Sequence, residues 1–220
     1  MLRNLNGHVA RMTTFVLCLL TSTPVFADPD GSGSAPAASQ TAEWSPDRGN
    51  IITDIVSDIR GGVLWQDADL INQDGSCHPF TSVDEGGVAL NLAVLFQTPH
   101  FLEWALAPRP FFNMSISPSG QTSLWAGGLS WGHQFRFGLY LDGYLGAAVN
   151  DGELDEGGTT GVKEMGARVT PFFAAELGFR FDEAQHHGLA LYVEHISHAK
   201  LFDQRNDALD NWGLRYSYRF

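Results

Sequence analysis

The final segment of the chain constrains its fold more than any other. From Trp212 to Phe220, every second residue is apolar or aromatic. Between them lie Gly213, Arg215, Ser217 and Arg219. This alternation has the period of a β-strand with one apolar face and one polar face. A chain that ends on such a strand, with Phe as its last residue, is typical of a β-barrel that closes in an outer membrane.

The same alternation recurs along the chain and predicts seven further strands. We expect the full set over residues 59–67, 87–97, 109–117, 122–134, 137–149, 166–181, 189–197 and 210–220. An even number of antiparallel strands closes a barrel with both termini in the periplasm. The predicted fold is therefore all-β, an eight-stranded antiparallel up-and-down outer-membrane barrel.

The strand pattern also predicts the connections and the interior. The longest loops, 68–86 and 150–164, fall at the outer side, and residues 98–108 form an unusually long periplasmic connector. Pro171 lies inside a predicted strand and removes a ladder donor, so we expect a bulge or broken pairing there. A paired polar core is expected from inward charged residues, namely Arg168, Arg180, Arg215 and Arg219 facing Asp142, Glu176 and Glu194.

The N-terminal region is expected to be a secretory leader followed by a flexible segment. Arg3 and Arg11 precede a short apolar run, and small residues before position 28 offer a cleavage site after Ala27. Residues 28–48 are rich in Pro, Gly, Ser and Ala, which is typical of a flexible leader. Residues 1–27 are thus a predicted signal peptide, and the barrel is expected over residues 49–220.

Composition narrows the class of partner. The formal net charge of −12 argues against nucleic acid, because phosphate binding needs a basic face. A hydrophobic content of 44% with only 17% charged residues suits a barrel that contacts outer-membrane lipids. His186 and His187 have no evident third ligand, so no metal site and no cofactor are expected. The sequence leaves the metal dependence of the activity open. The sequence leaves the oligomeric state open.

Three residues with the chemistry of a hydrolytic triad share the face that should meet lipid. In the strand over residues 189–197, His195 and Ser197 continue the outward row of Leu191. Asp210 has the outward parity of Leu214 in the next strand. Serine hydrolysis needs a base within reach and an acid that holds the base in one tautomer. Polar groups on a lipid face are costly, so these residues indicate an action on lipid.

The segment around these residues resembles the end of the lipid A 3-O-deacylase family, also labelled acyloxyacyl hydrolases or PagL. The resemblance rests on the run from His195 to Ala199, followed by Asn206, Asp207 and Asp210. The family pattern is His-x-Ser-Asn-Ala, then a loop, then a carboxylate that opens the last strand. His198 stands here in place of the Asn, and Asp210 in place of the usual Glu.

The resemblance implies a fold, a substrate and a site. The implied fold is an eight-stranded outer-membrane barrel, and the implied substrate is the 3-O-linked hydroxyacyl chain of lipid A in lipopolysaccharide. The implied catalytic residues are His195, Ser197 and Asp210, at the outer-leaflet side of the membrane. The loop acids Asp203 and Asp207 are alternatives to Asp210.

Further site residues are expected in the loop after Ser197. Donors near His198, Ala199 and Lys200 would meet the oxyanion, for example through backbone amides. Phe202 and Trp212 are candidates for an acyl groove, although a lipid-facing aromatic girdle explains them equally well.

Two other functions remain open at the level of the sequence. The chain could be a non-enzymatic small barrel, structural or adhesin-like, or it could be an acyltransferase that passes the acyl chain to an alcohol. Mass spectrometry of lipid A separates the three, because each changes the acyl content differently.

Overall fold

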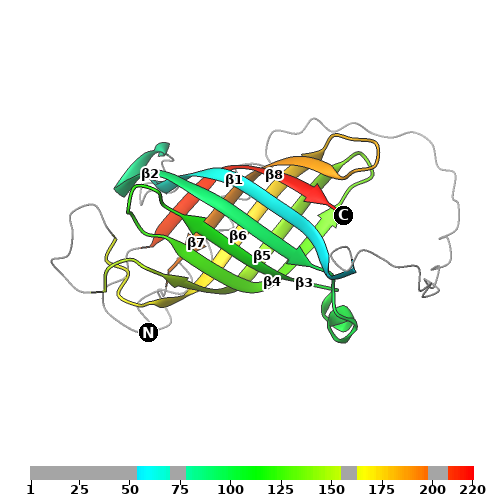
Figure 1. The fold of residues 1–220 in the computed structure, drawn as a ribbon, viewed down its shortest axis with the longest axis horizontal. Helices are drawn as coiled ribbons and strands as arrows, with labels where there is room; N and C mark the ends of the chain where they lie inside the picture. Colours follow the sequence, from blue (N-terminus) through cyan, green and yellow to red (C-terminus); the bar gives the residue numbers. More distant parts are fainter. Residues whose placement is uncertain (1–53, 70–77, 155–162, 198–207) are drawn as a thin grey trace, which may run out of the picture. The chain divides into compact units, whose positions relative to one another are not determined.

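The computed structural model describes residues 54–69, 78–154, 163–197 and 208–220. Within these residues, eight antiparallel strands close a barrel in sequence order, with the last strand paired to the first. Figure 1 shows that the strands that form the wall are tilted. The predicted fold class, an eight-stranded antiparallel up-and-down barrel, is confirmed.

Each predicted strand has a counterpart in the structure. The elements are β1 (Val56–Asp69), β2 (His78–Phe96), the 3₁₀ helix η1 (His100–Ala105), β3 (Arg109–Ile116), β4 (Leu124–Gln134), β5 (Leu139–Asn150), β6 (Val169–Arg180), β7 (His187–Ile196) and β8 (Leu209–Arg219). Over the described ranges, no helix is long and apolar enough to cross a membrane.

Side chains alternate between the two faces of the wall, as strand geometry requires. In β7, for example, Gly188, Ala190, Tyr192 and Glu194 are buried on the inner face. Leu189, which lies between Gly188 and Ala190 in the chain, is exposed on the outer face. The large exposed apolar residues of the strands include Ile59, Val63, Val88, Leu90, Leu92, Phe112, Trp125, Leu141, Leu145, Val149, Val169, Phe179, Leu189 and Leu214. Such an apolar outer surface is what a barrel presents to the lipid of a bilayer.

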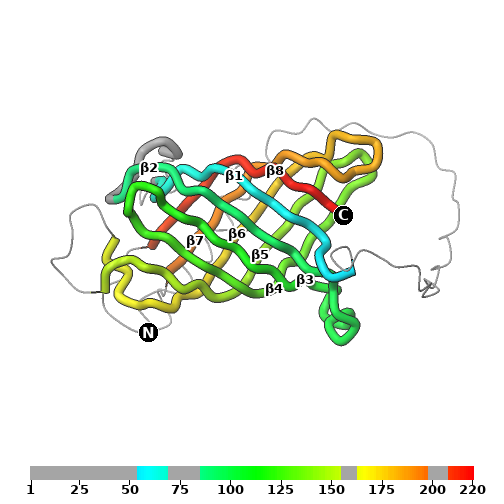
Figure 2. Tube along the Cα trace, viewed as in Figure 1, coloured from blue at the N-terminus to red at the C-terminus, as the bar shows by residue number. Residues whose placement is uncertain are grey.

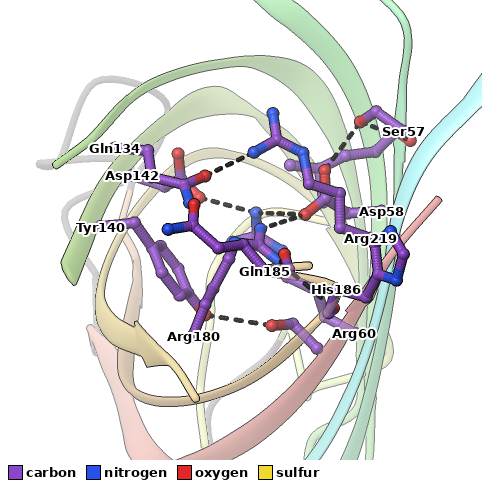
Figure 3. A network of polar contacts seen from close by, with 12 residues as sticks. Ser57, Asp58, Arg60, Gln134, Tyr140, Asp142, Arg180, Gln185, His186 and Arg219 are labelled. Carbon is purple, nitrogen blue, oxygen red and sulfur yellow. Dashed lines mark hydrogen bonds and ion pairs between the residues drawn. The ribbon is translucent and has the colours of Figure 1, made fainter. Parts of the chain in front are cut away.

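Buried charges fill part of the interior and are paired with one another (Figure 3). Arg60 is fully buried and lies 3.3 Å from Asp58, 2.7 Å from Asp142 and 2.9 Å from Glu176. Arg109 joins the same group, with contacts of 2.8 Å to both Asp58 and Asp142. Charges can be buried here because each has an opposite charge within hydrogen-bond distance.

The paired core predicted from parity is confirmed for two of its arginines. Arg180 contacts Asp58 at 2.7 Å, and Arg215 contacts Glu176 at 3.0 Å. The guanidinium of Arg215 also lies over the ring of Tyr192, 3.2 Å from its centroid. The two ion pairs join strands that are not neighbours in the wall, so they brace the barrel from within.

Two other arginines differ from that prediction. Arg168 precedes the first residue of β6 and donates instead to the carbonyl oxygens of Asn150 and Gly152. Arg219 donates to the side-chain oxygen of Gln134. Arg168 falls outside the strand, so parity does not govern where its side chain lies.

The predicted loop 68–86 is wrong over much of its length. β2 begins at His78, and it pairs with the end of β1 through Ala68↔Ser82 and Asp69↔His78. The register shifts between Gln66 and Ala68 and again after Ala68, so the two strands continue across bulges. The long predicted connector 98–108 is present between β2 and β3 and contains η1.

Pro171 lies in β6, and of the two predicted alternatives, a bulge or broken pairing, the structure shows broken pairing on one side. The register with β5 is continuous from Leu139↔Phe179 to Val149↔Val169. The ladder between β6 and β7 ends at the pair Phe172↔Ile196, so Pro171, the neighbour of Phe172 in β6, has no partner residue in β7. Proline is tolerated here because β6 is paired on only one side at this position.

β8 closes the barrel against β1, from Asp58↔Arg219 to Trp65↔Trp212. Gly213 pairs with Leu64 in this seam, and an added Cβ would lie only 2.7 Å from the Cα of Leu64. The backbones of the two strands therefore approach so closely that only glycine fits at position 213.

The two ends of the barrel carry different connections, which the trace in Figure 2 follows. One end carries the start of β1, the end of β8 and the connections 97–108, 135–138 and 181–186. The opposite end, called here the β7–β8 end, is where β7 finishes and β8 begins. It also carries the ends of β1, β3 and β5, the starts of β2, β4 and β6, and the connection 117–123.

Candidate active site

His195 and Asp210 meet across β7 and β8 on the outer face of the barrel. They are directly opposite in the antiparallel register, and His195 Nδ1 lies 2.6 Å from Asp210 Oδ1. Their side chains are 26% and 34% exposed. The pair is therefore half-buried in the wall and reachable from outside it.

The register explains why these two residues meet. Side chains that are directly opposite on neighbouring antiparallel strands lie about 5 Å apart at their Cβ atoms. Both residues have outward parity, so the imidazole and the carboxylate project from the same face. The expectation that Asp210 lies beside His195 is thus confirmed as geometry.

The hydrogen bond assigns different tasks to the two imidazole nitrogens. A carboxylate can only accept, so Nδ1 of His195 carries the hydrogen that it shares with Asp210. In the neutral ring, Nε2 is then the nitrogen with a free lone pair, and it can accept a proton from a neighbouring hydroxyl. The pair is arranged as a base held in one tautomer by an acid.

Ser197 follows the last residue of β7 directly and is 6% exposed. It lies two residues beyond His195, so the structure places it at the same end of β7. The predicted oxyanion residues His198, Ala199 and Lys200, the groove candidate Phe202 and the alternative acids Asp203 and Asp207 all lie outside the described residues.

Aromatic side chains flank the His–Asp pair on the outer face. Phe173 is directly opposite His195 on β6, with 6.4 Å between the ring centroids. Trp212, the predicted groove residue, lies one outward position along β8 from Asp210 and is opposite Val193. The sequence prediction did not include Phe173 in the site, although its outward parity in the neighbouring strand was the signal that would have found it.

Directly behind the pair, on the inner face, lie Glu194 and Asn211. They are also opposite in the register, and Asn211 Nδ2 donates to Glu194 Oε1 at 2.9 Å. Glu194 further accepts from Ser115 Oγ at 2.6 Å, Tyr192 OH at 3.0 Å and Asn113 Nδ2 at 3.2 Å. Buried polar groups fully supplied with partners rigidify the backbone that carries them, so the outward pair sits on a fixed support.

No cluster of three or more His, Cys, Asp or Glu side chains suited to a metal ion occurs in the part of the chain that the structure describes. The structure brings His195 and Asp210 together, and Ser197 follows the last residue of the same strand.

Fold and site together define a membrane β-barrel that carries a base–acid pair on its lipid-facing wall. The family model for lipid A 3-O-deacylase (PagL) matches residues 98–219, more than half of the chain. The chain belongs to this family, which places it among outer-membrane lipid A deacylases.

Comparison with solved structures returns other small barrels of the outer membrane. The crystal structure of the outer membrane enzyme PagL is 12% identical, covers 74% of this chain and 100% of its own, and has a TM-score of 0.47. The outer membrane protein Ail of Yersinia pestis is 13% identical, covers 76% and 99%, and has a TM-score of 0.42. A comparison with curated proteins gave no match.

Proposed function

We propose that this protein is a serine esterase that removes the 3-O-linked hydroxyacyl chain from lipid A. The observation that carries the proposal is the 2.6 Å contact between His195 Nδ1 and Asp210 Oδ1 on the lipid-facing wall. A polar pair is costly on such a surface unless it has a task there. The family match to lipid A 3-O-deacylase supports the choice of substrate and of ester position.

In the proposed reaction, the Oγ of Ser197 attacks the carbonyl carbon of the ester. Nε2 of His195 takes the hydroxyl proton, and Asp210 stabilises the imidazolium that forms. Backbone N–H groups near His198 and Ala199 are the proposed donors to the oxyanion. Collapse of the tetrahedral intermediate breaks the ester bond, and His195 returns the proton to the sugar oxygen that leaves.

The second half of the reaction regenerates the serine. Water attacks the acyl-serine, and His195 accepts a proton from this water and passes it to Ser197 Oγ as the acyl–oxygen bond breaks. The products are a free 3-hydroxy fatty acid and a lipid A with a free hydroxyl at position 3. Atoms balance with water as the only co-reactant, so the proposal needs no metal and no cofactor.

We further propose that the site works in the outer leaflet. An even number of strands puts both termini in the periplasm, so the β7–β8 end lies at the outer side of the membrane. Lipid A occupies the outer leaflet, and the His–Asp pair lies where β7 finishes at that end.

Mass spectrometry of lipid A from cells with and without the protein tests the proposal. We expect loss of one hydroxyacyl mass with the wild type and no loss with Ser197→Ala. Ser119→Ala is the matched control, because Ser119 is an exposed serine in the β3–β4 connection at the same end of the barrel. Gain of an acyl chain would indicate a transferase and not a hydrolase, and unchanged lipid A would indicate a barrel without enzymatic activity.

A further inference from the structure

A buried ion pair lies inside the β7–β8 end of the barrel and has no place in the proposed reaction. Lys163 Nζ, from the connection between β5 and β6, is 3.0 Å from Asp67 Oδ1, near the end of β1. The side chains are 4% and 2% exposed. A buried lysine is stable only when its charge is matched, so this pair holds together two segments that are distant in the sequence.

Asp67 is held in an unusual backbone conformation. Its φ is 53°, and it lies where the register between β1 and β2 shifts, between Gln66 and Ala68. The other carboxylate oxygen, Oδ2, accepts from the backbone N–H of Glu85 at 2.8 Å. A left-handed conformation is costly for a residue with a Cβ, and it persists only where surrounding contacts fix it.

Both members of the ion pair also reach the start of β8. Lys163 Nζ donates to the carbonyl oxygen of Ala208 at 3.1 Å. The backbone N–H of Asp67 donates to Asn211 Oδ1 at 3.0 Å. Ala208 and Asn211 stand on either side of Asp210 in the chain, so the two contacts bracket the acid of the proposed site.

These contacts fall where β8 lacks its second ladder. The pairing of β8 with β1 ends at Trp65↔Trp212, whereas the pairing with β7 continues to Ile196↔Leu209. Before Trp212, two other contacts hold this part of the chain: Lys163 Nζ donates to the Ala208 carbonyl, and the backbone N–H of Asp67 donates to the side chain of Asn211.

We propose that Asp67 and Lys163 form a clasp that positions Asp210 against His195. The clasp consists of the ion pair, its contact with the Ala208 carbonyl and the Asp67–Asn211 hydrogen bond. Asp67 and Lys163 are positioning residues, since they lie on the inner face and act on the pair only through β8. This inference rests on the proposed function for its catalytic consequence, but the geometry it concerns is independent of the substrate.

Removing the cation should slow turnover more than it weakens binding. In Lys163→Met, we expect kcat to fall about tenfold with KM changed less than about twofold, because a shifted Asp210 no longer fixes the imidazole. Lys163→Arg keeps a cation that can pair with Asp67 and should recover most of the kcat. Arg168→Met is the matched control, because Arg168 is a cation of the same β5–β6 connection, and its side chain donates to the carbonyl oxygens of Asn150 and Gly152.

A spectroscopic readout separates positioning from general loss of structure. In protein labelled with ¹⁵N-histidine and folded in detergent micelles, the short His195–Asp210 hydrogen bond should give a low-field Nδ1–H proton resonance. Its assignment comes from its absence in His195→Ala. We expect the resonance to shift upfield or broaden in Lys163→Met and to be unchanged in Arg168→Met, with all variants showing the heat-modifiable gel mobility of a folded barrel.

The outcomes separate the clasp from the proposed function. A wild-type resonance and wild-type kcat in Lys163→Met would overturn the clasp. If Ser197→Ala keeps full activity, the proposed function fails, yet the resonance still decides whether the clasp positions the pair. If Lys163→Met does not fold, Lys163→Gln retains a donor without the charge, and the same two results on it support or overturn the clasp.

Discussion

Asn211 donates a hydrogen bond of 2.9 Å to Glu194 inside the barrel, directly behind the position where Asp210 meets His195 on the outside. The two pairs occupy successive positions of the same two strands and face opposite ways. An interaction on one face therefore fixes the backbone from which the interaction on the other face projects. This arrangement makes separate predictions for activity and for stability.

The nucleophile and the base should each be indispensable. We expect Ser197→Ala and His195→Ala to abolish deacylation, because one removes the attacking oxygen and the other removes the proton acceptor. Both variants should keep the heat-modifiable mobility of the folded barrel. Release of fatty acid from lipopolysaccharide in detergent micelles measures the activity. Near-normal release by Ser197→Ala would remove serine hydrolysis from consideration.

The acid should be Asp210 rather than a residue of the loop before it. Asp210→Asn should lower turnover about tenfold or more, because an amide does not stabilise the imidazolium as a carboxylate does. Asp210→Glu should retain or raise activity. Asp203→Asn and Asp207→Asn should have little effect, and the rates of these four variants in micelles check the assignment. If Asp207→Asn is instead the variant with the large loss of turnover, Asp207 and not Asp210 is the acid.

Glu194 should matter to stability. Its carboxylate accepts from Asn211, Ser115, Tyr192 and Asn113, and the residue is 2% exposed. Glu194→Ala would leave these buried donors without their acceptor, at a cost of about 2–4 kcal/mol in the free energy of unfolding. Glu194→Gln keeps one acceptor oxygen and should cost less. Urea unfolding in lipid vesicles, followed by tryptophan fluorescence, measures both; equal stability of Glu194→Ala and wild type would contradict the supporting role.

The seam between β8 and β1 should not accept a side chain at position 213. In Gly213→Val, the added carbons would collide with the backbone of Leu64, so the strands must separate or shift register. We expect a lower yield of the heat-modifiable folded form after refolding into micelles. Gly120→Ala is the comparison, because an added Cβ there meets nothing within 4 Å, although its φ of 81° imposes some backbone strain. A Gly213→Val variant that folds as well as wild type would contradict the close approach.

The strands were predictable because a wall with lipid outside and polar groups inside alternates residue by residue. The start of β2 was not, because residues 78–86 combine Pro79, Gly86 and charged residues without clear alternation. Pairing with the bulged end of β1 makes this segment a strand, and sequence periodicity does not carry information about a partner.

The His–Asp pair was predictable for the same reason, since parity and register suffice to place two outward residues on neighbouring strands. Lys163 was not, because it lies in a connection, where no period fixes the direction of a side chain. Its contact with Asp67 depends on a bulge, and a bulge changes parity locally. Arg60 shows the same limit inside the barrel, since two of its carboxylate partners, Asp142 and Glu176, come from β5 and β6, whose relation to β1 appears only on closure.

The filled interior has a kinetic consequence. In the described residues, Arg60, Arg215 and their partners fill part of the barrel interior, and His195 lies on the outer face, so under the proposed function a lipid would reach His195 from the side. A substrate must arrive sideways, by diffusion within the leaflet. The encounter is then two-dimensional, and its rate depends on the mole fraction of substrate among the surrounding lipids rather than on its bulk concentration. Adding inert detergent at constant enzyme and substrate should slow the reaction by surface dilution alone.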